Sequence, residues 1–196
     1  MLRALARLYA RVFGWRLADG LPATRKYVLI GYPHTSNWDF VAMLMFSLIG
    51  GVKFSWVGKQ ALFRRPYGGV MRRLGGIPVD RSRSQGAVEQ LVEAFKAADE
   101  LILIVTPEGT RGHVDHWRSG FYHVAVGAGV PVGLGYVDWE KKTGSFAVLM
   151  DLTGDVATDM GRIRAFYEGR TGKRPELAGT IRLREEDAAA PPPATS

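Results

Sequence analysis

The chain has 196 residues, of which 46% are hydrophobic and 23% charged, and it contains no cysteine. These values predict one globular domain with a substantial core, and they exclude collagen-like, coiled-coil and intrinsically disordered chains. Without cysteine, disulfides, thiolate metal sites and a cysteine nucleophile are excluded as well. The apolar run at residues 40–52 is shorter than the about 20 residues of a membrane-spanning helix, and we expect no such helix.

Positive charge is concentrated in two segments of the chain. The formal net charge is +7, yet residues 1–30 carry +5 and residues 53–83 carry +7, so the remainder is net negative. Such regional charge attracts phosphate groups, anionic lipid headgroups, acidic carrier proteins or nucleic acid, and it does not by itself distinguish among them.

Residues 1–20 predict a basic amphipathic helix. Arg3, Arg7 and Arg11 fall on one side at helical spacing. The other side is apolar and consists of Leu2, Leu5, Leu8, Tyr9, Val12, Phe13 and Trp15. Two interpretations stay open: the helix lies in the headgroup plane of an anionic membrane, or it packs its apolar side on the protein's own core. Four arginines within the first 17 residues exclude a signal peptide, so we expect a cytoplasmic protein.

Strands and helices are expected to alternate along the rest of the chain. Short apolar or β-branched runs predict strands at 26–32, 54–58, 76–79, 101–106, 130–137 and 145–149. Helical periodicity predicts helices from about residue 38 and at 67–74, 85–97, 117–128 and 156–169. This alternation predicts an α/β fold: one layered domain over 21–184, with a central, mostly parallel or mixed sheet flanked by helices. The proline-containing tail, 185–196, is predicted to be disordered.

A first polar cluster follows the strand at 26–32. His34 and Asp39 flank the start of the next predicted helix, whose first turn would bring them together. The aspartate would then accept a hydrogen bond from one ring nitrogen and leave the other free as a base. The competing interpretation is that Asp39 or Asn37 caps the helix and His34 is incidental.

Two further clusters follow other predicted strands. Glu108, Gly109, Thr110 and Arg111 come after the strand at 101–106, with a glycine suited to a tight turn and an arginine suited to phosphate. Arg81 comes after the strand at 76–79. Open α/β sheets bind their ligands at the carboxyl ends of strands, so the three clusters are expected to share one site.

In this order the clusters resemble the motifs of the glycerolipid acyltransferase family, typified by 1-acylglycerol-3-phosphate acyltransferases. His34–Asp39 matches the His-x4-Asp motif, Gly76–Arg81 the second block, Glu108–Arg111 the Glu-Gly-Thr-Arg motif, and Val130–Val132 the fourth block. The segments 59–69 and 117–125 also follow the family's spacing, so the resemblance covers residues 27–138. The sequence departs from the pattern at Pro33, Ala61 and Pro78, and the departure in the second block bears on the acceptor.

The resemblance implies an O-acyltransferase that moves a fatty acyl group from an acyl thioester to a lysophospholipid hydroxyl. His34 is then the general base and Asp39 orients it. Arg81, Arg111 and Lys59 are candidates for the acceptor's phosphate. Glu108 is expected either to bind an acceptor hydroxyl or to hold Arg111, and Gly109 and Thr110 are expected to bind substrate in the same turn.

The implied partners follow from this activity. The donor is acyl-CoA or acyl carrier protein, the acceptor is a lysophospholipid such as 1-acylglycerol-3-phosphate, and the protein is peripheral on the cytoplasmic face of an anionic membrane. Neither cofactor nor metal is expected, and no nucleic acid, because the chain has no recognised nucleic-acid-binding motif. The alternatives are an amino-acid lipid or glycolipid precursor as acceptor, or a non-catalytic basic module that binds membrane or nucleic acid.

Three weaker signals have simpler interpretations. His113, Asp115 and His116 stand close enough in sequence to suggest a metal site, but the two imidazoles have no distant third ligand in a recognised motif. His123 is expected to be an interior histidine. The helix over residues 40–49 either packs in the core or lines an acyl-chain groove, and core packing is favoured.

Overall fold

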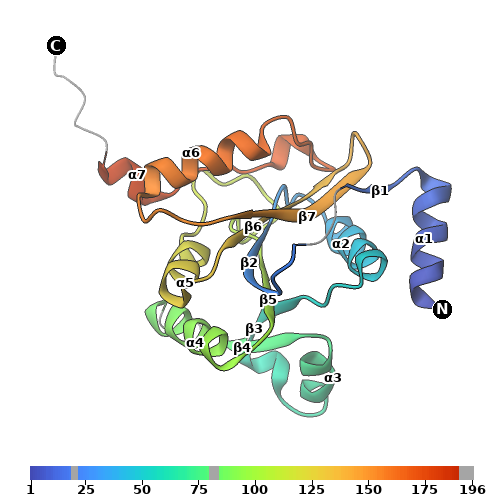
Figure 1. The fold of residues 1–196 in the computed structure, drawn as a ribbon, viewed down its shortest axis with the longest axis horizontal. Coiled ribbons are helices and arrows are strands. Elements are labelled where there is room, and N and C mark those ends of the chain that lie inside the picture. Colours follow the sequence, from blue (N-terminus) through green and yellow to red (C-terminus); the bar gives the residue numbers. More distant parts are fainter. Residues whose placement is uncertain (19–21, 80–83, 190–196) are drawn as a thin grey trace.

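The computed structural model describes residues 1–18, 22–79 and 84–189 (Figure 1). It is built on a seven-stranded sheet with the strand order β1-β7-β6-β2-β5-β3-β4. The strands are β1 (Arg16–Leu17), β2 (Lys26–Gly31), β3 (Ser55–Lys59), β4 (Gly76–Val79), β5 (Leu101–Val105), β6 (Val132–Asp138) and β7 (Thr143–Met150). Every neighbouring pair is parallel except β6 and β7, which pair antiparallel. The predicted α/β class with a mostly parallel sheet is therefore confirmed.

Central strand β2 shows why the sheet is covered on both faces. Tyr27 and Leu29 are buried in one hydrophobic cluster, whereas Val28 and Ile30 are buried in the other. Because successive side chains of a strand point to opposite faces, an entirely apolar strand needs packing partners on both sides.

Helices provide these partners on either side of the sheet. They are α1 (Leu2–Phe13), α2 (Asn37–Gly50), α3 (Gly68–Arg73), α4 (Ser84–Ala97), α5 (Gly120–Ala128), α6 (Val156–Tyr167) and α7 (Arg184–Ala189), with short 3-10 helices at Gln60–Phe63 and Pro175–Leu177. Side chains of α4, α5 and α6 form one core cluster with the sheet, and those of α2 and α1 form the other. No described helix is both long and apolar enough to cross a membrane.

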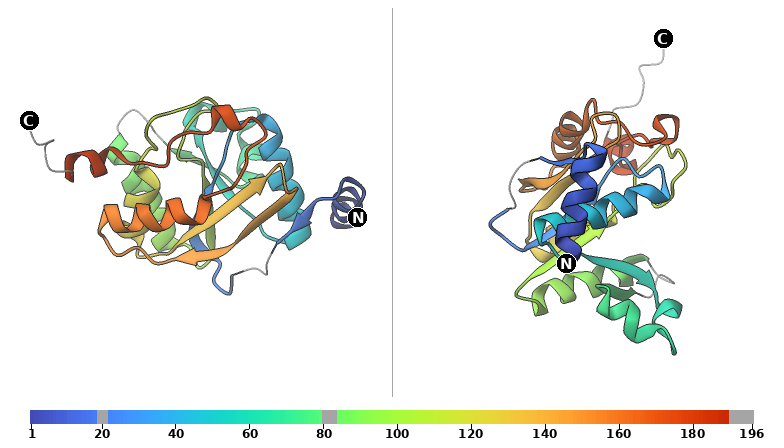
Figure 2. Two further views of the ribbon diagram at one scale, coloured as in Figure 1. Left: turned by 90° about the horizontal axis from the view of Figure 1, so that it is seen from above. Right: turned by 90° about the vertical axis from the view of Figure 1, so that its right-hand side faces the viewer.

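Helix α1 lies outside helix α2 and away from the sheet, as the two views of Figure 2 show. It contacts the protein through two small residues, Ala6 and Ala10, which are buried. The Nε atom of Arg3 donates a hydrogen bond to the carbonyl of Ile49. The helix ends at Gly14, whose positive φ of 74° suits glycine.

The larger apolar side chains of α1 remain exposed, with exposures from 46% to 67% for Leu2, Leu5, Leu8, Tyr9, Val12 and Phe13. The interpretation in which this side packs on the protein's own core is therefore wrong. The small side chains of Ala6 and Ala10 let their side of the helix approach α2 more closely than the larger apolar side chains would. Trp15, which follows the helix, is the exception and is buried.

The chain past Leu183 differs from the predicted disordered tail, because its first part forms helix α7. Ion pairs attach this helix to the domain: Glu186 contacts Arg164 at 2.7 Å, and Asp187 contacts both Arg182 and His116. A sequence without apolar periodicity gave no sign of these long-range charge contacts. Residues 190–196 lie outside the described residues.

Candidate active site

The candidate site lies where three neighbouring parallel strands, β6, β2 and β5, end side by side. In the register of the sheet, Gly31 of β2 pairs with Gly135 of β6, and Ile30 pairs with Val105 of β5. The residues that follow these strands therefore emerge at the same edge of the sheet. His34 follows β2 and Glu108 follows β5, so the predicted meeting of the two motifs is a consequence of strand order.

His34 and Asp39 lie next to each other at the start of helix α2. The His34 Nδ1 atom is 3.5 Å from Asp39 Oδ2, which is a contact longer than an ordinary hydrogen bond. The imidazole is about one-fifth exposed and the carboxylate is buried. With Nδ1 facing the carboxylate, Nε2 is the ring nitrogen placed to take a proton.

Asp39 also caps helix α2, as the competing interpretation predicted, while the catalytic role of His34 stays a prediction. Its Oδ2 atom accepts hydrogen bonds from the backbone N–H groups of Thr35 and Ser36, each at 2.8 Å. Ser36 is the N-cap residue and forms a capping box with Asp39. The cap holds the Oδ2 atom of the carboxylate beside His34.

Trp139 supplies a further contact to the same carboxylate. Its indole Nε1 donates to Asp39 Oδ1 at 2.7 Å from a position directly after β6. Sequence reasoning missed this residue, because a lone tryptophan after a strand carries no motif. Only the pairing of β6 with β2 places it against the start of α2.

Glu108 is almost fully buried and binds two backbone segments. Its Oε2 atom accepts from the His34 N–H and its Oε1 atom from the Gly179 N–H, both at 2.8 Å. Burial raises the pKa of the Glu108 carboxyl, although these two N–H donors oppose the shift. Glu108 therefore holds the backbone of His34 rather than Arg111, and its predicted role in binding an acceptor hydroxyl stays a prediction.

Arg111 lies beside the start of helix α2, where its guanidinium donates a hydrogen bond to the side chain of Asn37. The turn that precedes it requires Gly109, which has a positive φ of 66° and lies against Arg118, so that a Cβ would come within 2.6 Å of the guanidinium. Thr110 is exposed, and its hydroxyl accepts from the backbone of Gly112 at 3.4 Å. The structure therefore brings Arg111 to the His34 motif.

Of the other two predicted cations, Lys59 lies at the end of the next strand, β3. Strand β3 ends at Lys59, whose Cα pairs in register with that of Val79 at the end of β4. Arg81 lies outside the described residues. The backbone of Lys59 is therefore at the expected edge of the sheet.

A segment near the end of the domain closes one side of the site. The Arg174 N–H donates to the buried hydroxyl of Thr35 at 3.1 Å, and the carbonyl of Thr171 accepts from the Trp139 N–H at 2.9 Å. Gly179, besides its bond to Glu108, accepts from the Tyr32 hydroxyl. Backbone groups make these contacts, and no sequence pattern could have revealed them.

The site opens into a groove of about 2420 Å³ that contains His34, Asp39 and Glu108 in its lining. Helix α2 contributes Phe40, Leu44 and Leu48, which are exposed, while its other side places Met45 and Phe46 in the core. Core packing is therefore confirmed for one side of the helix, and the acyl-chain groove stays a prediction for the side that lines the groove.

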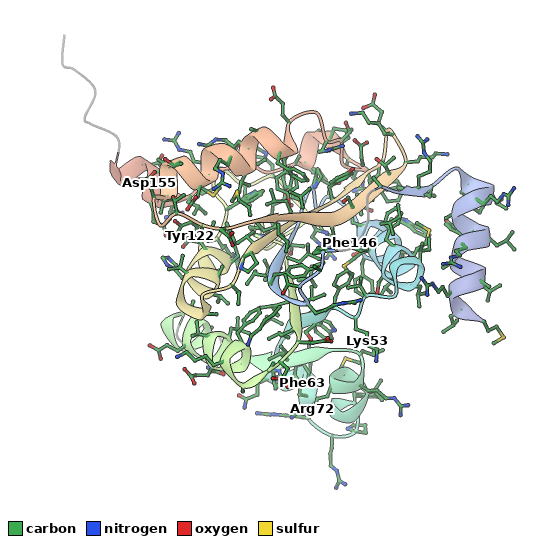
Figure 3. The ribbon with its side chains drawn as sticks, in the orientation of Figure 1. Lys53, Phe63, Arg72, Tyr122, Phe146 and Asp155 are labelled. Carbon is green, nitrogen blue, oxygen red and sulfur yellow. The ribbon has the colours of Figure 1, made fainter. Side chains whose placement is uncertain are left out.

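Basic side chains lie farther along the groove. Its lining includes Lys53, Arg72 and Arg73, and the Arg72 guanidinium lies 5.4 Å from the ring centre of Phe63. Figure 3 shows Lys53, Phe63 and Arg72 around helix α3 and strands β3 and β4, on the opposite side of the molecule from helix α6.

The remaining histidines have structural partners. His113 Nδ1 is 2.8 Å from the carbonyl of Ala178, and His116 Nε2 is 2.7 Å from Asp187 Oδ2. The prediction of an interior His123 is wrong, because its side chain is 53% exposed and lies 3.5 Å from Glu185. Its position on α5 turns it away from the sheet and toward α7.

A family model described as Acyltransferase matches residues 16–158, which is most of the chain. The chain belongs to this acyltransferase family. The matched range contains both polar motifs and the strands that place them side by side. The family predicted from the ordered motifs is thereby confirmed, and the protein is an acyltransferase.

Among solved structures, this acyltransferase resembles the 1-acyl-sn-glycerophosphate (LPA) acyltransferase PlsC from Thermotoga maritima. The match has a TM-score of 0.56 and 18% sequence identity, and it covers 88% of this chain and 80% of PlsC. At this identity the likeness shows a shared fold. A search of curated protein sequences finds no match.

Proposed function

We propose that this acyltransferase moves a fatty acyl group from an acyl thioester to the hydroxyl of a lysophospholipid such as 1-acylglycerol-3-phosphate. The observation that carries the proposal is the pairing of His34 with Asp39 at the edge of the sheet, with Arg111 beside them and a large groove in front. A family fold resembling that of PlsC supports the same substrate class.

In the proposed mechanism, His34 Nε2 takes the proton of the acceptor hydroxyl as that oxygen attacks the thioester carbonyl carbon. The carbon–sulfur bond then breaks, and the departing thiolate takes the proton from the imidazolium. Asp39 stabilises the positive charge on His34 while it lasts. The transfer is direct, so no acyl-enzyme forms.

The groove has room for both substrates. Small-ligand pockets are about 300–1,000 Å³, and this groove is larger. The exposed apolar side of α2 suits an acyl chain, and Lys53, Arg72 and Arg73 suit the phosphates of CoA or an acidic carrier protein.

Thiol release tests the proposal directly. The protein is mixed with acyl-CoA or acyl carrier protein, anionic liposomes and a panel of lysophospholipids, amino-acid lipids and glycolipid precursors. Because the protein has no cysteine, a thiol-reactive dye detects only the released carrier thiol. Release that requires a lysophospholipid supports the proposal. Thiol release that requires a different acceptor contradicts the proposal, and so does the absence of release with every pair of donor and acceptor.

Arg111 is proposed to bind the acceptor's phosphate. We expect Arg111→Ala to raise the acceptor KM by about 30-fold while it changes the thioester KM less than about 3-fold, because a charge-assisted contact to phosphate is lost. Steady-state kinetics with each substrate varied in turn measure the two values, and Arg111→Lys serves as the charge-preserving control. An equal rise in both KM values would show that Arg111 does not serve the acceptor specifically.

Membrane attachment through α1 is proposed as the route to lipid substrates. The helix exposes its apolar side chains and carries Arg3, Arg7 and Arg11, a combination suited to the headgroup region of an anionic bilayer. The exposed apolar residues Trp38, Phe40 and Val41 at the start of α2 are suited to the same surface. The protein is then peripheral, on the cytoplasmic face of the cell membrane.

The matching prediction concerns an exposed leucine of this helix. We expect Leu8→Glu to weaken binding to anionic vesicles by at least about 10-fold, because one buried leucine contributes about 1.5–3 kcal/mol. Leu8 is 58% exposed, so the folded domain tolerates the change. Vesicle sedimentation measures binding, with Val126→Glu on α5 as a control of similar exposure, 51%. Equal binding by both variants would remove α1 as the attachment surface.

A further inference from the structure

The Asp39 carboxylate is held by donors from two distant parts of the chain. Oδ2 accepts from the adjacent backbone and faces His34, whereas Oδ1 accepts from Trp139, 100 residues away. Asp39 is only 5% exposed, so the loss of a hydrogen bond at either oxygen costs more free energy than it would in water. The indole N–H is thus a donor to the carboxylate oxygen that does not make the 3.5 Å contact with His34.

The indole of Trp139 is itself fixed by its neighbours. Trp15 packs against it edge to face, with ring centres 5.1 Å apart and an interplanar angle of 87°. Trp15 is 9% exposed and also packs on Phe46 of helix α2. On the other side, Lys173 Nζ lies 4.3 Å from the Trp139 ring centre and 5.0 Å from that of Trp38.

Helix α1 and the His34 motif therefore meet at the β6–β7 turn. Trp15 directly follows α1, and the Lys142 ammonium of the turn donates to the carbonyl of Phe13 at the helix end. Arg16 pairs with Thr143 at the start of β7. The same turn carries Trp139, so the packing of α1 and the orientation of Asp39 depend on one structural unit.

We propose that Trp139 is a positioning residue, whose indole N–H orients the Asp39 carboxylate toward His34, and that Trp15 holds the indole in place. The proposal rests on the proposed function, in which His34 is the base. Among the described residues, the charged groups near the pair include Glu108 on the His34 backbone, Arg111 on Asn37, and Lys173 on the indole. Trp139→Phe leaves the contacts of Glu108 and Arg111 unchanged and keeps an aromatic ring beside Lys173.

Trp139→Phe tests the proposal in the full-length protein. We expect kcat to fall by about 10-fold while both KM values change less than about 2-fold, because orientation is lost and binding is not. Benzothienylalanine at position 139 replaces the N–H by sulfur and keeps the ring shape. It gives the same result if the hydrogen bond matters, even should the smaller phenylalanine disturb the fold.

A second measurement does not depend on activity. NMR of the histidine ring protons follows the titration of His34, assigned with His34→Gln. Without the indole N–H, the Asp39 carboxylate is no longer oriented toward the imidazole and stabilises a protonated His34 less, so the midpoint is expected to fall. Trp38→Phe makes the same change in the other indole beside Lys173 and leaves the midpoint in place. Trp15→Leu shifts it in the same direction as Trp139→Phe, by less.

The outcomes separate the two proposals. An unchanged His34 midpoint in Trp139→Phe and in the benzothienylalanine protein overturns the positioning role, whatever the activity. A lowered midpoint in a Trp139→Phe protein whose wild type releases no thiol with any acceptor supports the role of Trp139 and contradicts the proposed function.

Discussion

His34→Ala is expected to lower kcat for acyl transfer by about 10²–10⁴-fold, because the variant loses the general base. The imidazole is about one-fifth exposed, and the backbone of His34 stays bound to Glu108. The variant should therefore fold normally and keep its KM values. Thiol release from the thioester donor, with and without acceptor, measures the loss.

A surface histidine provides the control for this experiment. His113 is half exposed and follows the same strand β5 as Glu108, and His113→Ala should change kcat by less than about 2-fold. If His34→Ala retained activity within about 10-fold of the wild type, His34 would not be the base.

Glu108→Ala is expected to lower the free energy of unfolding by about 2–4 kcal/mol, because the buried Gly179 N–H and the half-buried His34 N–H lose their acceptor. The segment that carries His34 would lose one of its fixed points, so activity should fall with stability. Urea denaturation measures the change, and Glu176→Ala, which removes an exposed carboxylate, should stay within about 0.5 kcal/mol of the wild type.

The effect of Glu108→Ala should also depend on pH. Burial raises the pKa of the carboxyl in the folded protein above the ordinary value of 4.5, so the folded state binds this proton more tightly than the unfolded state. The contribution of Glu108 to the free energy of unfolding is then complete below about pH 4.5. It declines as pH rises through the pKa of the carboxyl in the folded protein. The difference in the free energy of unfolding between wild type and Glu108→Ala should therefore become smaller as pH rises over that range. A constant difference would mean that Glu108 ionises alike in both states.

Much of the fold could be predicted because the relevant signals are local. The apolar run at Lys26–Gly31, which a proline follows closely, identifies a buried strand. The polar motifs that come directly after the predicted strands mark the strand ends at which polar groups gather. Helix ends such as Ala128, before a glycine with a positive φ of 63°, follow from local backbone preferences. Strand type, helix periodicity and turn chemistry are properties of short segments, so a single sequence contains them.

The sequence also determined the chemical groups of the site. His34, Asp39 and Arg111 are specified by residue type and by their position after a strand, and the structure brings these three residues to one place. The family match agrees with the chemistry that their order implied.

The tertiary structure alone decided which groups hold that site together. Trp139 reaches Asp39 because β6 pairs with β2. Gly179 reaches Glu108 because the segment that contains Thr171, Arg174 and Gly179 returns to this edge of the sheet. Likewise, only packing showed that α1 docks through Ala6 and Ala10 and leaves its larger apolar side chains exposed. These contacts join residues 71 to 100 positions apart or depend on which of two helix sides fits a neighbour, and no local pattern encodes either.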